Sequence, residues 1–146
     1  MKNKKTKTVV LVKPDGVMKK AVGSIRERYT AVGLSVKSEH RIRFTEEHAR
    51  RFYAEHDGMR FFEGLVLSMC AGEVVAWLLE GEDAIEAVRK LNGATDPRQA
   101  LPGTIRKDFL SAGGPFNTVH GSASEEEAEK EWKIVLECAR SATPAK

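Results

Sequence analysis

The sequence alternates short β-branched runs with segments of helical periodicity, and this alternation most limits the folds open to it. Thr8-Val-Val-Leu-Val-Lys13 and Glu73-Val-Val-Ala-Trp-Leu-Leu79 are typical of buried strands, because each is short, apolar and rich in β-branched residues. Between them, apolar residues recur at helical spacing from Val22 until Gly33, which ends that helix. The pattern therefore predicts a domain in which strands and helices are interleaved.

The rest of the chain continues this order. Further predicted elements are a strand over 34–42, helices over 61–69 and 83–91, a strand over 118–120, and helices that begin at Thr45 and Ser124. Acidic residues follow Thr45 and Ser124, as expected after helix N-caps. The loop over 94–102 holds two prolines, and its length indicates a functional loop. Periodicity alone fits either a parallel sheet or a split β-α-β, ferredoxin-like sheet.

Length and composition favour a single domain over residues 1–146, with a basic arm over 1–7 and a frayed tail over 139–146. Lys and Arg number 24 against 21 Asp and Glu, so the net charge is +3. This mild excess permits attraction to phosphates but does not require a nucleic-acid partner.

Two further observations indicate a cytoplasmic protein. The apolar run that ends before Pro14 is too short for a signal sequence or a membrane span. Cys70 and Cys138 have neither C-x-x-C nor metal-ligand spacing, so we expect two reduced, buried thiols.

The common catalytic motifs are absent from the sequence, including the P-loop, G-x-G-x-x-G, H-E-x-x-H and G-x-S-x-G. Single polar residues instead lie where elements begin or end. They occur in Lys13-Pro14-Asp15-Gly16-Val17, in Arg89 ahead of Gly93-Ala94-Thr95-Asp96-Pro97, in Pro102-Gly103-Thr104-Ile105-Arg106, and in Asn117-Thr118-Val119-His120-Gly121-Ser122. Taken singly, a lysine, arginine or histidine at such a position is usually solvated or structural.

Taken together, these segments resemble the nucleoside diphosphate kinase family from about Thr8 to Trp132. Asn-x-x-His-Gly-Ser is specific in the company of Lys-Pro-Asp-Gly-Val and Pro-Gly-Thr-Ile-Arg, and Tyr53 and Phe61-Phe62-x-Gly64-Leu65-Val66 also match. The resemblance implies an α+β, ferredoxin-like sandwich, with a four-stranded antiparallel sheet covered by helices. It also implies a homo-oligomer and a ping-pong transfer of the terminal phosphate of an NTP to an NDP through a phosphohistidine.

The resemblance implies a catalytic set of His120, Lys13, Tyr53, Glu131 and Ser122. His120 would be the nucleophile, a role that suits imidazole because it is nucleophilic and partly neutral near pH 7. Glu131 and Ser122 would orient His120, whereas Lys13 and Tyr53 would lie beside the transferred phosphoryl group. We expect Gly121 to let phosphate and nucleotide approach the backbone closely.

The implied nucleotide-binding set is Lys13, Phe61, Leu65, Arg89, Thr95, Arg106 and Asn117. Arg89 and Arg106 would clamp phosphates, since guanidinium forks match phosphate oxygens. Phe61 would stack the base, which makes the site tolerant of ATP and other nucleoside di- and triphosphates. Mg²⁺ is expected to arrive on the nucleotide phosphates, with no metal-ligating residues from the protein.

Two departures from the family pattern affect details of the site. Ala123 follows His-Gly-Ser where the family usually has Asp. The segment before Asn117 is one residue longer than usual, which leaves the residue opposite Phe61 open between Ala112, Gly113 and Phe116.

Two other functions compete with this interpretation. A catalytically idle scaffold would typically lack the histidine or a phosphate-binding arginine, but His120, Arg89 and Arg106 are all present. A module for single-stranded nucleic acid would use the lysine-rich start and the aromatic residues. The charge of only +3 and the 7% aromatic content argue against it as the main function and leave nucleic acid at most a secondary partner.

Overall fold

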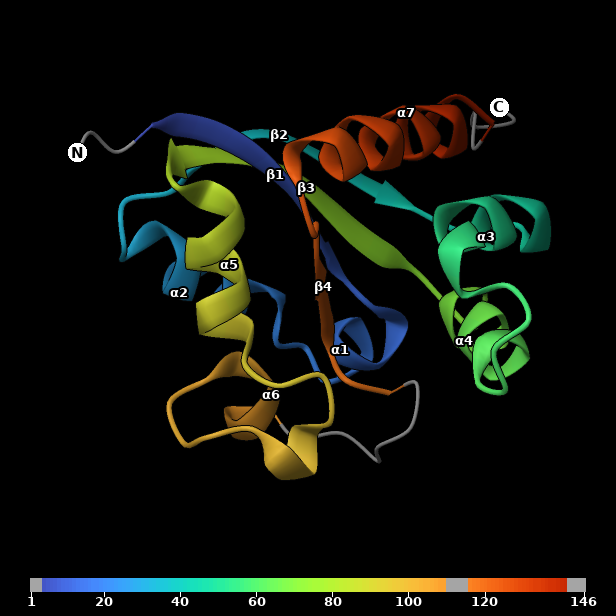
Figure 1. Cartoon of the computed structure of the whole chain (residues 1–146), viewed down its shortest axis with the longest axis horizontal. Helices are drawn as coiled ribbons and strands as arrows, with labels where there is room; N and C mark the ends of the chain where they lie inside the picture. Colours follow the sequence, from blue (N-terminus) through green and yellow to red (C-terminus); the bar gives the residue numbers. More distant parts are fainter. Residues whose placement is uncertain (1–3, 110–115, 142–146) are drawn as a thin grey trace.

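The computed structural model describes residues 4–109 and 116–141. Its centre is a four-stranded sheet in the order β2-β3-β1-β4 (Figure 1). The strands are β1 (Lys5–Val12), β2 (Ser35–Ile42), β3 (Val74–Glu82) and β4 (Val119–Gly121). Every pair of neighbouring strands is antiparallel. The sheet is therefore the ferredoxin-like one, and the parallel alternative that periodicity left open is excluded.

The helices follow the predicted order, with additional short ones. They are α1 (Pro14–Met18), α2 (Val22–Thr30), α3 (Glu46–Phe52), α4 (Phe62–Met69), α5 (Ala84–Asn92), α6 (Ile105–Asp108) and α7 (Glu125–Ser141), with 3₁₀ turns η1 (Ala54–His56) and η2 (Pro97–Gln99). Both predicted N-caps are confirmed. The hydroxyl of Thr45 accepts a hydrogen bond from the amide of His48, and that of Ser124 accepts one from the amide of Glu127.

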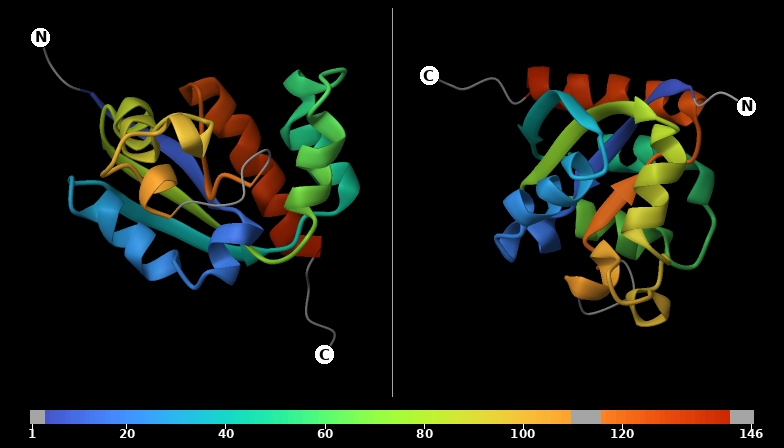
Figure 2. Two further views of the ribbon diagram at one scale, coloured as in Figure 1. Left: turned by 90° about the horizontal axis from the view of Figure 1, so that it is seen from below. Right: turned by 90° about the vertical axis from the view of Figure 1, so that its left-hand side faces the viewer.

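The central strand β1 separates two apolar cores. Val9 and Leu11 pack with α3, α4 and α7 on one face of the sheet. Val10 and Val12 pack with α2, α5 and α6 on the other. In the left view of Figure 2, α2 and α7 accordingly lie on opposite sides of the strands. Because all four of these side chains are fully buried, β1 is fixed from both faces.

The ends of the ordered elements differ from the expected arm and tail. β1 already begins at Lys5, inside the segment expected to be an arm, and residues 1–3 lie outside the described residues. α7 continues to Ser141, so residues 139–141 are helical rather than part of a frayed tail. Residues 142–146 are not described.

Two remaining expectations concern the cysteines and the membrane. Cys70 and Cys138 are both free thiols, and Cys138 is buried whereas Cys70 is half-buried. Within the described residues, no helix is long and apolar enough to cross a membrane.

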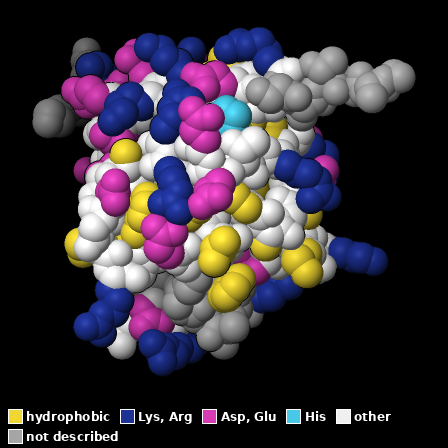
Figure 3. Space-filling model, turned by 90° about the vertical axis from the view of Figure 1, so that its right-hand side faces the viewer, with side chains coloured by type: hydrophobic (Ala, Val, Ile, Leu, Met, Phe, Trp, Pro, Cys, Tyr) yellow, Lys and Arg dark blue, Asp and Glu magenta, His cyan; other side chains and the backbone are white. Residues whose placement is uncertain are grey.

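The outer surface around α3 and α4 carries paired charges. Arg50 bonds to Glu46 at 2.8 Å and to Glu63 at 2.6 Å, and Arg51 bonds to Glu137 of α7 at 2.6 Å. Figure 3 shows basic and acidic side chains intermingled on this side of the molecule. Opposite charges therefore neutralise each other there.

Candidate active site

His120 lies on β4, opposite Leu11 of β1, and faces α7. Its Nε2 is 3.0 Å from Oε1 of Glu131, and its side chain is 17% exposed. Because a carboxylate accepts hydrogen bonds, we assign the proton of the neutral imidazole to Nε2 and the lone pair to Nδ1. Among the described residues, no group forms a hydrogen bond with Nδ1. This nitrogen is therefore available as a nucleophile.

Ser122 and Glu131 continue the polar chain from His120 into the core. The Ser122 hydroxyl donates to the same Glu131 oxygen at 2.7 Å and accepts from the backbone amide of Val9 at 3.0 Å. Glu131 is buried, whereas Glu125 on the same helix is exposed. Glu131 thus does not belong to the solvated face of α7, and its geometry suits the orienting role proposed for it.

Aromatic rings form one wall beside His120. The rings of Phe52 and Tyr53 lie 5.0 Å and 5.8 Å from the imidazole, centroid to centroid. The Tyr53 hydroxyl donates to Sδ of Met69 at 3.7 Å, and burial raises the pKa of Tyr53 so that the phenol stays neutral. The rings of Tyr53 and His120 are nearly perpendicular, at 87°, so Tyr53 is a direct neighbour of the histidine. Phe52 was not singled out from the sequence, because an apolar aromatic residue on a helix carries no signal that separates a site residue from a core residue.

Lys13 continues the course of β1 to the same side as Leu11. Its Nζ donates to Oδ1 of Asn117 at 2.9 Å, and the side chain is 3% exposed. Burial lowers the pKa of Lys13 to about 8, with a smaller raising effect from Asp15 and a smaller lowering one from Arg106. Lys13 and Asn117, both members of the implied nucleotide-binding set, are therefore in contact.

A strained turn brings the Lys13 and His120 segments together. Thr118 has a positive φ of 74°, and the amide of Val119 donates to the carbonyl of Asn117 at 2.8 Å, which closes a γ-turn. The Thr118 amide donates to Oδ2 of Asp15 at 3.0 Å, and the Lys13 amide donates to the Thr118 carbonyl at 2.9 Å. Asp15, to which the sequence interpretation gave no role, thus helps to hold this turn.

Arg106 bonds to three backbone carbonyls in two segments of the site. Its guanidinium donates to the carbonyls of Gly93, Asn117 and Val119 at 2.8, 3.2 and 2.7 Å. Desolvation lowers the pKa of Arg106, although arginine remains charged in proteins. A guanidinium has five N–H donors, so two remain for a ligand. Phosphate contact and structural support are thus compatible in the same side chain.

The other nucleotide-binding candidates surround this centre. Arg89 is exposed on α5, and its charge acts on Arg106. Thr95 is also exposed, and its carbonyl accepts from Nδ2 of Asn117 at 3.0 Å. Two neighbouring positive charges with a hydroxyl-bearing residue nearby make this end of the site suited to an anion.

Phe61 and Leu65 occupy different environments at the start of α4. Phe61 is 47% exposed, and its ring lies 5.2 Å from that of His56, which stacks on Tyr53 at 6.2 Å. Leu65 is buried and anchors α4 to the apolar core. For the position opposite Phe61, Ala112 and Gly113 lie outside the described residues, whereas Phe116 is described and is 39% exposed.

Gly121 is required for packing between β4 and α5. A Cβ atom added there would lie 2.8 Å from Val88 and 3.0 Å from Asn92, both on α5. The absence of a side chain therefore lets β4 pack closely against α5.

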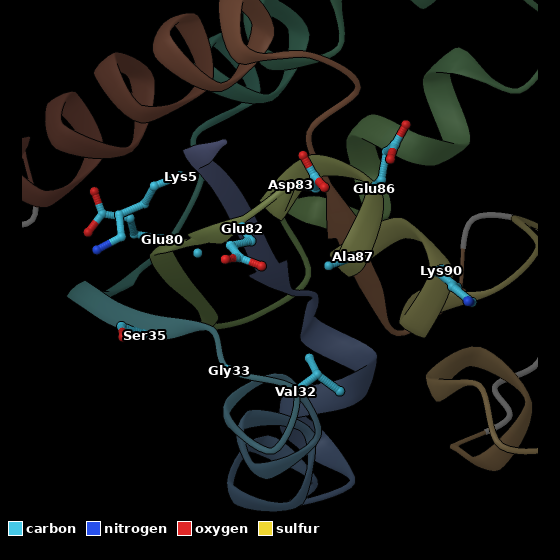
Figure 4. A pocket seen from close by; sticks show the side chains of 11 residues that line it. Lys5, Val32, Gly33, Ser35, Glu80, Glu82, Asp83, Glu86, Ala87 and Lys90 are labelled. Carbon is cyan, nitrogen blue, oxygen red and sulfur yellow. The ribbon is translucent and has the colours of Figure 1, made fainter. Parts of the chain in front are cut away.

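A separate hollow of about 570 Å³ lies where β3 meets α5, and its walls carry both signs of charge (Figure 4). Lys5, Glu80, Glu82, Asp83, Glu86 and Lys90 are among its lining residues. None of the candidate catalytic or nucleotide-binding residues lines it. We therefore assign the chemistry to the region around His120.

Residues 6–140 match the sequence family described as nucleoside diphosphate kinase. The nucleoside diphosphate kinase of Methanocaldococcus jannaschii is 42% identical over 130 residues, which cover 89% of this chain and 92% of that protein. The structure of the Halobacterium salinarum enzyme in complex with CDP has a TM-score of 0.83 and 41% identity, covering 91% of this chain and 87% of that one. The Borrelia burgdorferi enzyme, solved as a transition-state mimic with vanadate and ADP, has a TM-score of 0.83 and 32% identity, covering 89% and 86%.

These similarities extend over nearly the whole chain and confirm the resemblance seen in the sequence. They support nucleoside diphosphate kinase function rather than an idle scaffold or a nucleic-acid-binding module. The chain therefore belongs to the nucleoside diphosphate kinase family of phosphotransferases.

Proposed function

We propose that this chain transfers the terminal phosphate of an NTP to an NDP by a ping-pong route with a phosphohistidine on His120. The contact between Nε2 and Glu131 carries this proposal, because it leaves the Nδ1 lone pair available beside a group of cationic side chains. Glu131 and Ser122 fix the tautomer and the orientation of the ring.

The reaction has two matched steps. In the first, the Nδ1 lone pair forms a bond to the γ-phosphorus, and the bond from that phosphorus to the bridging oxygen breaks, which releases an NDP. The imidazole becomes positively charged, and Glu131 stabilises that charge through the Nε2 proton. In the second step, a terminal oxygen of another NDP attacks the phosphorus, and the N–P bond electrons return to Nδ1.

Positive charge around the phosphates supports this transfer. Lys13, Arg89 and Arg106 would hold the phosphate oxygens, on which negative charge is spread in the transition state. Thr95 would add a neutral hydroxyl. Asn117, whose side chain already holds Nζ of Lys13, would share the ribose 3′ hydroxyl with that lysine.

The base would be held only by stacking on Phe61, with Leu65 supporting the helix beneath it. The exposure of Phe61 supports this role, since a ring face must be accessible to stack. The two structural relatives were solved with CDP and ADP, which carry different bases. We infer that this chain likewise accepts several nucleotides, ATP among them.

We also propose Mg²⁺ as the cofactor, carried on the nucleotide phosphates. Within residues 4–109 and 116–141, no group of three or more His, Cys, Asp or Glu is arranged to hold a metal ion. The donor set of the site is instead cationic and suits phosphate, so it fits a metal held by phosphate oxygens and water. When bound there, Mg²⁺ supplies charge neutralisation for the phosphates.

Two further proposals concern assembly and location. We infer a homo-oligomer, which is supported by apolar side chains that are more than half exposed, namely Met18, Val32, Met59, Leu67 and Leu101. Light scattering on the purified chain would test this, and a monomeric mass would contradict it.

A cytoplasmic location is supported by the two free thiols, which are typical of reducing compartments.

Intact-protein mass spectrometry tests the chemistry directly. After the protein is mixed with ATP and Mg²⁺, we expect a gain of one acid-labile phosphate that added GDP or CDP removes. His120→Ala should bind nucleotide and show no gain, because the nucleophile is gone. Appreciable phosphate exchange by His120→Ala, or no phosphate gain by the native protein, would contradict the proposal.

A further inference from the structure

Helix α6 is a single turn of four residues that carries Arg106. One turn of helix cannot stabilise itself, because its nucleation cost exceeds what its few hydrogen bonds return. Its own supports are the Thr104 hydroxyl, which accepts from the amide of Lys107 at 3.4 Å, and the fully buried side chain of Ile105. The position of Arg106 therefore depends on contacts that reach α6 from elsewhere in the chain.

Arg28 of α2 contacts the chain on both sides of this turn. One guanidinium nitrogen donates to the carbonyl of Gly103 at 3.2 Å, just before α6. Another donates to Oδ2 of Asp108 at 2.9 Å, and the guanidinium carbon lies 5.2 Å from the centre of the Phe109 ring, at the end of α6. Asp108 also accepts from the Gly103 amide at 3.1 Å, which closes the loop on itself.

A second cation holds the same end of α6. Nζ of Lys19 donates to the carbonyl of Phe109 at 2.9 Å, and the Thr118 hydroxyl donates to that carbonyl at 3.0 Å. Because Thr118 belongs to the turn that precedes His120, the clamped end of α6 is linked directly to the catalytic strand.

We propose that Arg28 is a positioning residue for phosphate binding, which fixes α6 and thereby the guanidinium of Arg106. The inference rests on the proposed function of Arg106 as a phosphate ligand and extends it to a residue outside the site. Arg28 itself touches no reacting group in this arrangement. Its planar fork can serve a carbonyl and a carboxylate together while stacking on a ring, which a lysine cannot do.

The expected effect is local rather than global. The side chains of Arg28 and Asp108 are each about one-third exposed, at 33% and 31%, and such ion pairs add little to overall stability. A displaced Arg106 guanidinium, by contrast, would meet the phosphate oxygens with poorer hydrogen-bond geometry in the bound complex and in the transition state alike, which weakens nucleotide binding and changes kcat little.

The test compares Arg28→Ala with the native chain and with Arg26→Ala. Arg26 lies on the same helix, is exposed, and forms no hydrogen bond or ion pair with any described residue. We expect Arg28→Ala to raise the KM for nucleotide and the Kd for ADP about 3- to 10-fold, with kcat changed by less than about twofold. Arg26→Ala should match the native chain, and Arg28→Lys should restore part of the loss.

A double-mutant cycle separates positioning from a general structural effect. If Arg28 acts through Arg106, Arg28→Ala should cause no further loss of ADP binding in an Arg106→Ala background. Unchanged ADP binding in Arg28→Ala, or equal losses in both backgrounds, would overturn the inference. So would a loss confined to kcat that follows the fraction of unfolded protein, measured by circular dichroism.

Calorimetric ADP binding keeps this test distinct from that of the proposed function. A native chain that binds ADP but gains no phosphate from ATP would contradict the phosphohistidine route, and the cycle would still decide the role of Arg28. A native chain that is active, with Arg28→Ala indistinguishable from it, would overturn only this inference.

Discussion

Two arginines in this molecule have opposite surroundings. Arg50, on the face of α3 and α4, is 38% exposed and bonds to the carboxylates of Glu46 and Glu63. Arg106, beside His120, is half-buried, and its side-chain hydrogen bonds go to the carbonyls of Gly93, Asn117 and Val119. The guanidinium of Arg50 is paired with charged oxygens, whereas that of Arg106 bonds, among the described residues, only to neutral ones.

The difference shows how a fold can prepare a site for anions. A carboxylate partner cancels the charge of an arginine, as on the outer face, and leaves little field for a ligand. Carbonyl partners fix the side chain and leave its charge in place, strengthened by poor solvation. Two further cations are electrostatically coupled to Arg106. The charge of Arg89 lowers the pKa of Arg106, and the charge of Arg106 lowers the pKa of Lys13. We propose that phosphate oxygens are the anionic partners of these three cations.

The largest effect should separate the two arginines directly. We expect Arg106→Ala to lower kcat/KM by on the order of 10² to 10³, because it removes a charged donor from a desolvated site. Arg50→Ala, the matched control, should stay within about twofold, because exposed ion pairs contribute little. Steady-state kinetics with ATP and an NDP measures both, and thermal melts exclude unfolding. Similar losses in the two variants would mean that the different hydrogen-bond partners of Arg106 and Arg50 do not matter for activity.

The next comparison is between two glutamates of α7. Glu131→Gln should slow transfer by on the order of 10², because the amide stabilises the imidazolium less well than a carboxylate does. Glu137→Gln removes a carboxylate that faces Arg51 on the outer surface, and it should leave the rate within about twofold. Single-turnover phosphorylation from ATP is the measurement. An unchanged rate in Glu131→Gln would reduce Glu131 to a structural residue.

The smallest effect concerns pH and Lys13. Burial lowers the pKa of this lysine to about 8, so kcat/KM should fall by about tenfold per unit as the pH rises above that value and the ammonium loses its proton. The folded state binds fewer protons than the unfolded state between about 8 and the ordinary value of 10.5, so the stability contribution of Lys13 increases with pH across that window. Rate profiles and urea unfolding test the two signs. A profile flat to pH 10 would contradict the lowered pKa.

The main elements could be predicted because each combines an apolar pattern with a residue that marks its beginning or its end. β1 is apolar on both faces and ends before Pro14, and α7 has a polar cap at Ser124 followed by a regular apolar stripe. α1 and α6 were not predicted, since a single turn is too short to show periodicity. Antiparallel pairing depends on where the connecting helices return the chain, and strand patterns do not record that.

The site divides in the same way. His120 and Ser122 were identified through a specific motif and Glu131 through the family resemblance, and the structure brings their side chains into contact. Phe52 was missed because a ring against a catalytic histidine has the same helical spacing as a ring in the core. The bond between the Val9 amide and Ser122 joins positions 113 residues apart, so no local pattern could reveal it.

The hydrogen bond from the Val9 amide to Ser122 connects a backbone amide of the core to the polar chain beside His120. The N–H of Val9 lies in the middle of the sheet, yet its acceptor is the Ser122 hydroxyl that in turn donates to Glu131. We therefore expect a change of charge on His120 to alter the chemical shift of the Val9 amide. Nuclear magnetic resonance of this single backbone signal would report on the state of His120 from inside the protein, without labelled substrate.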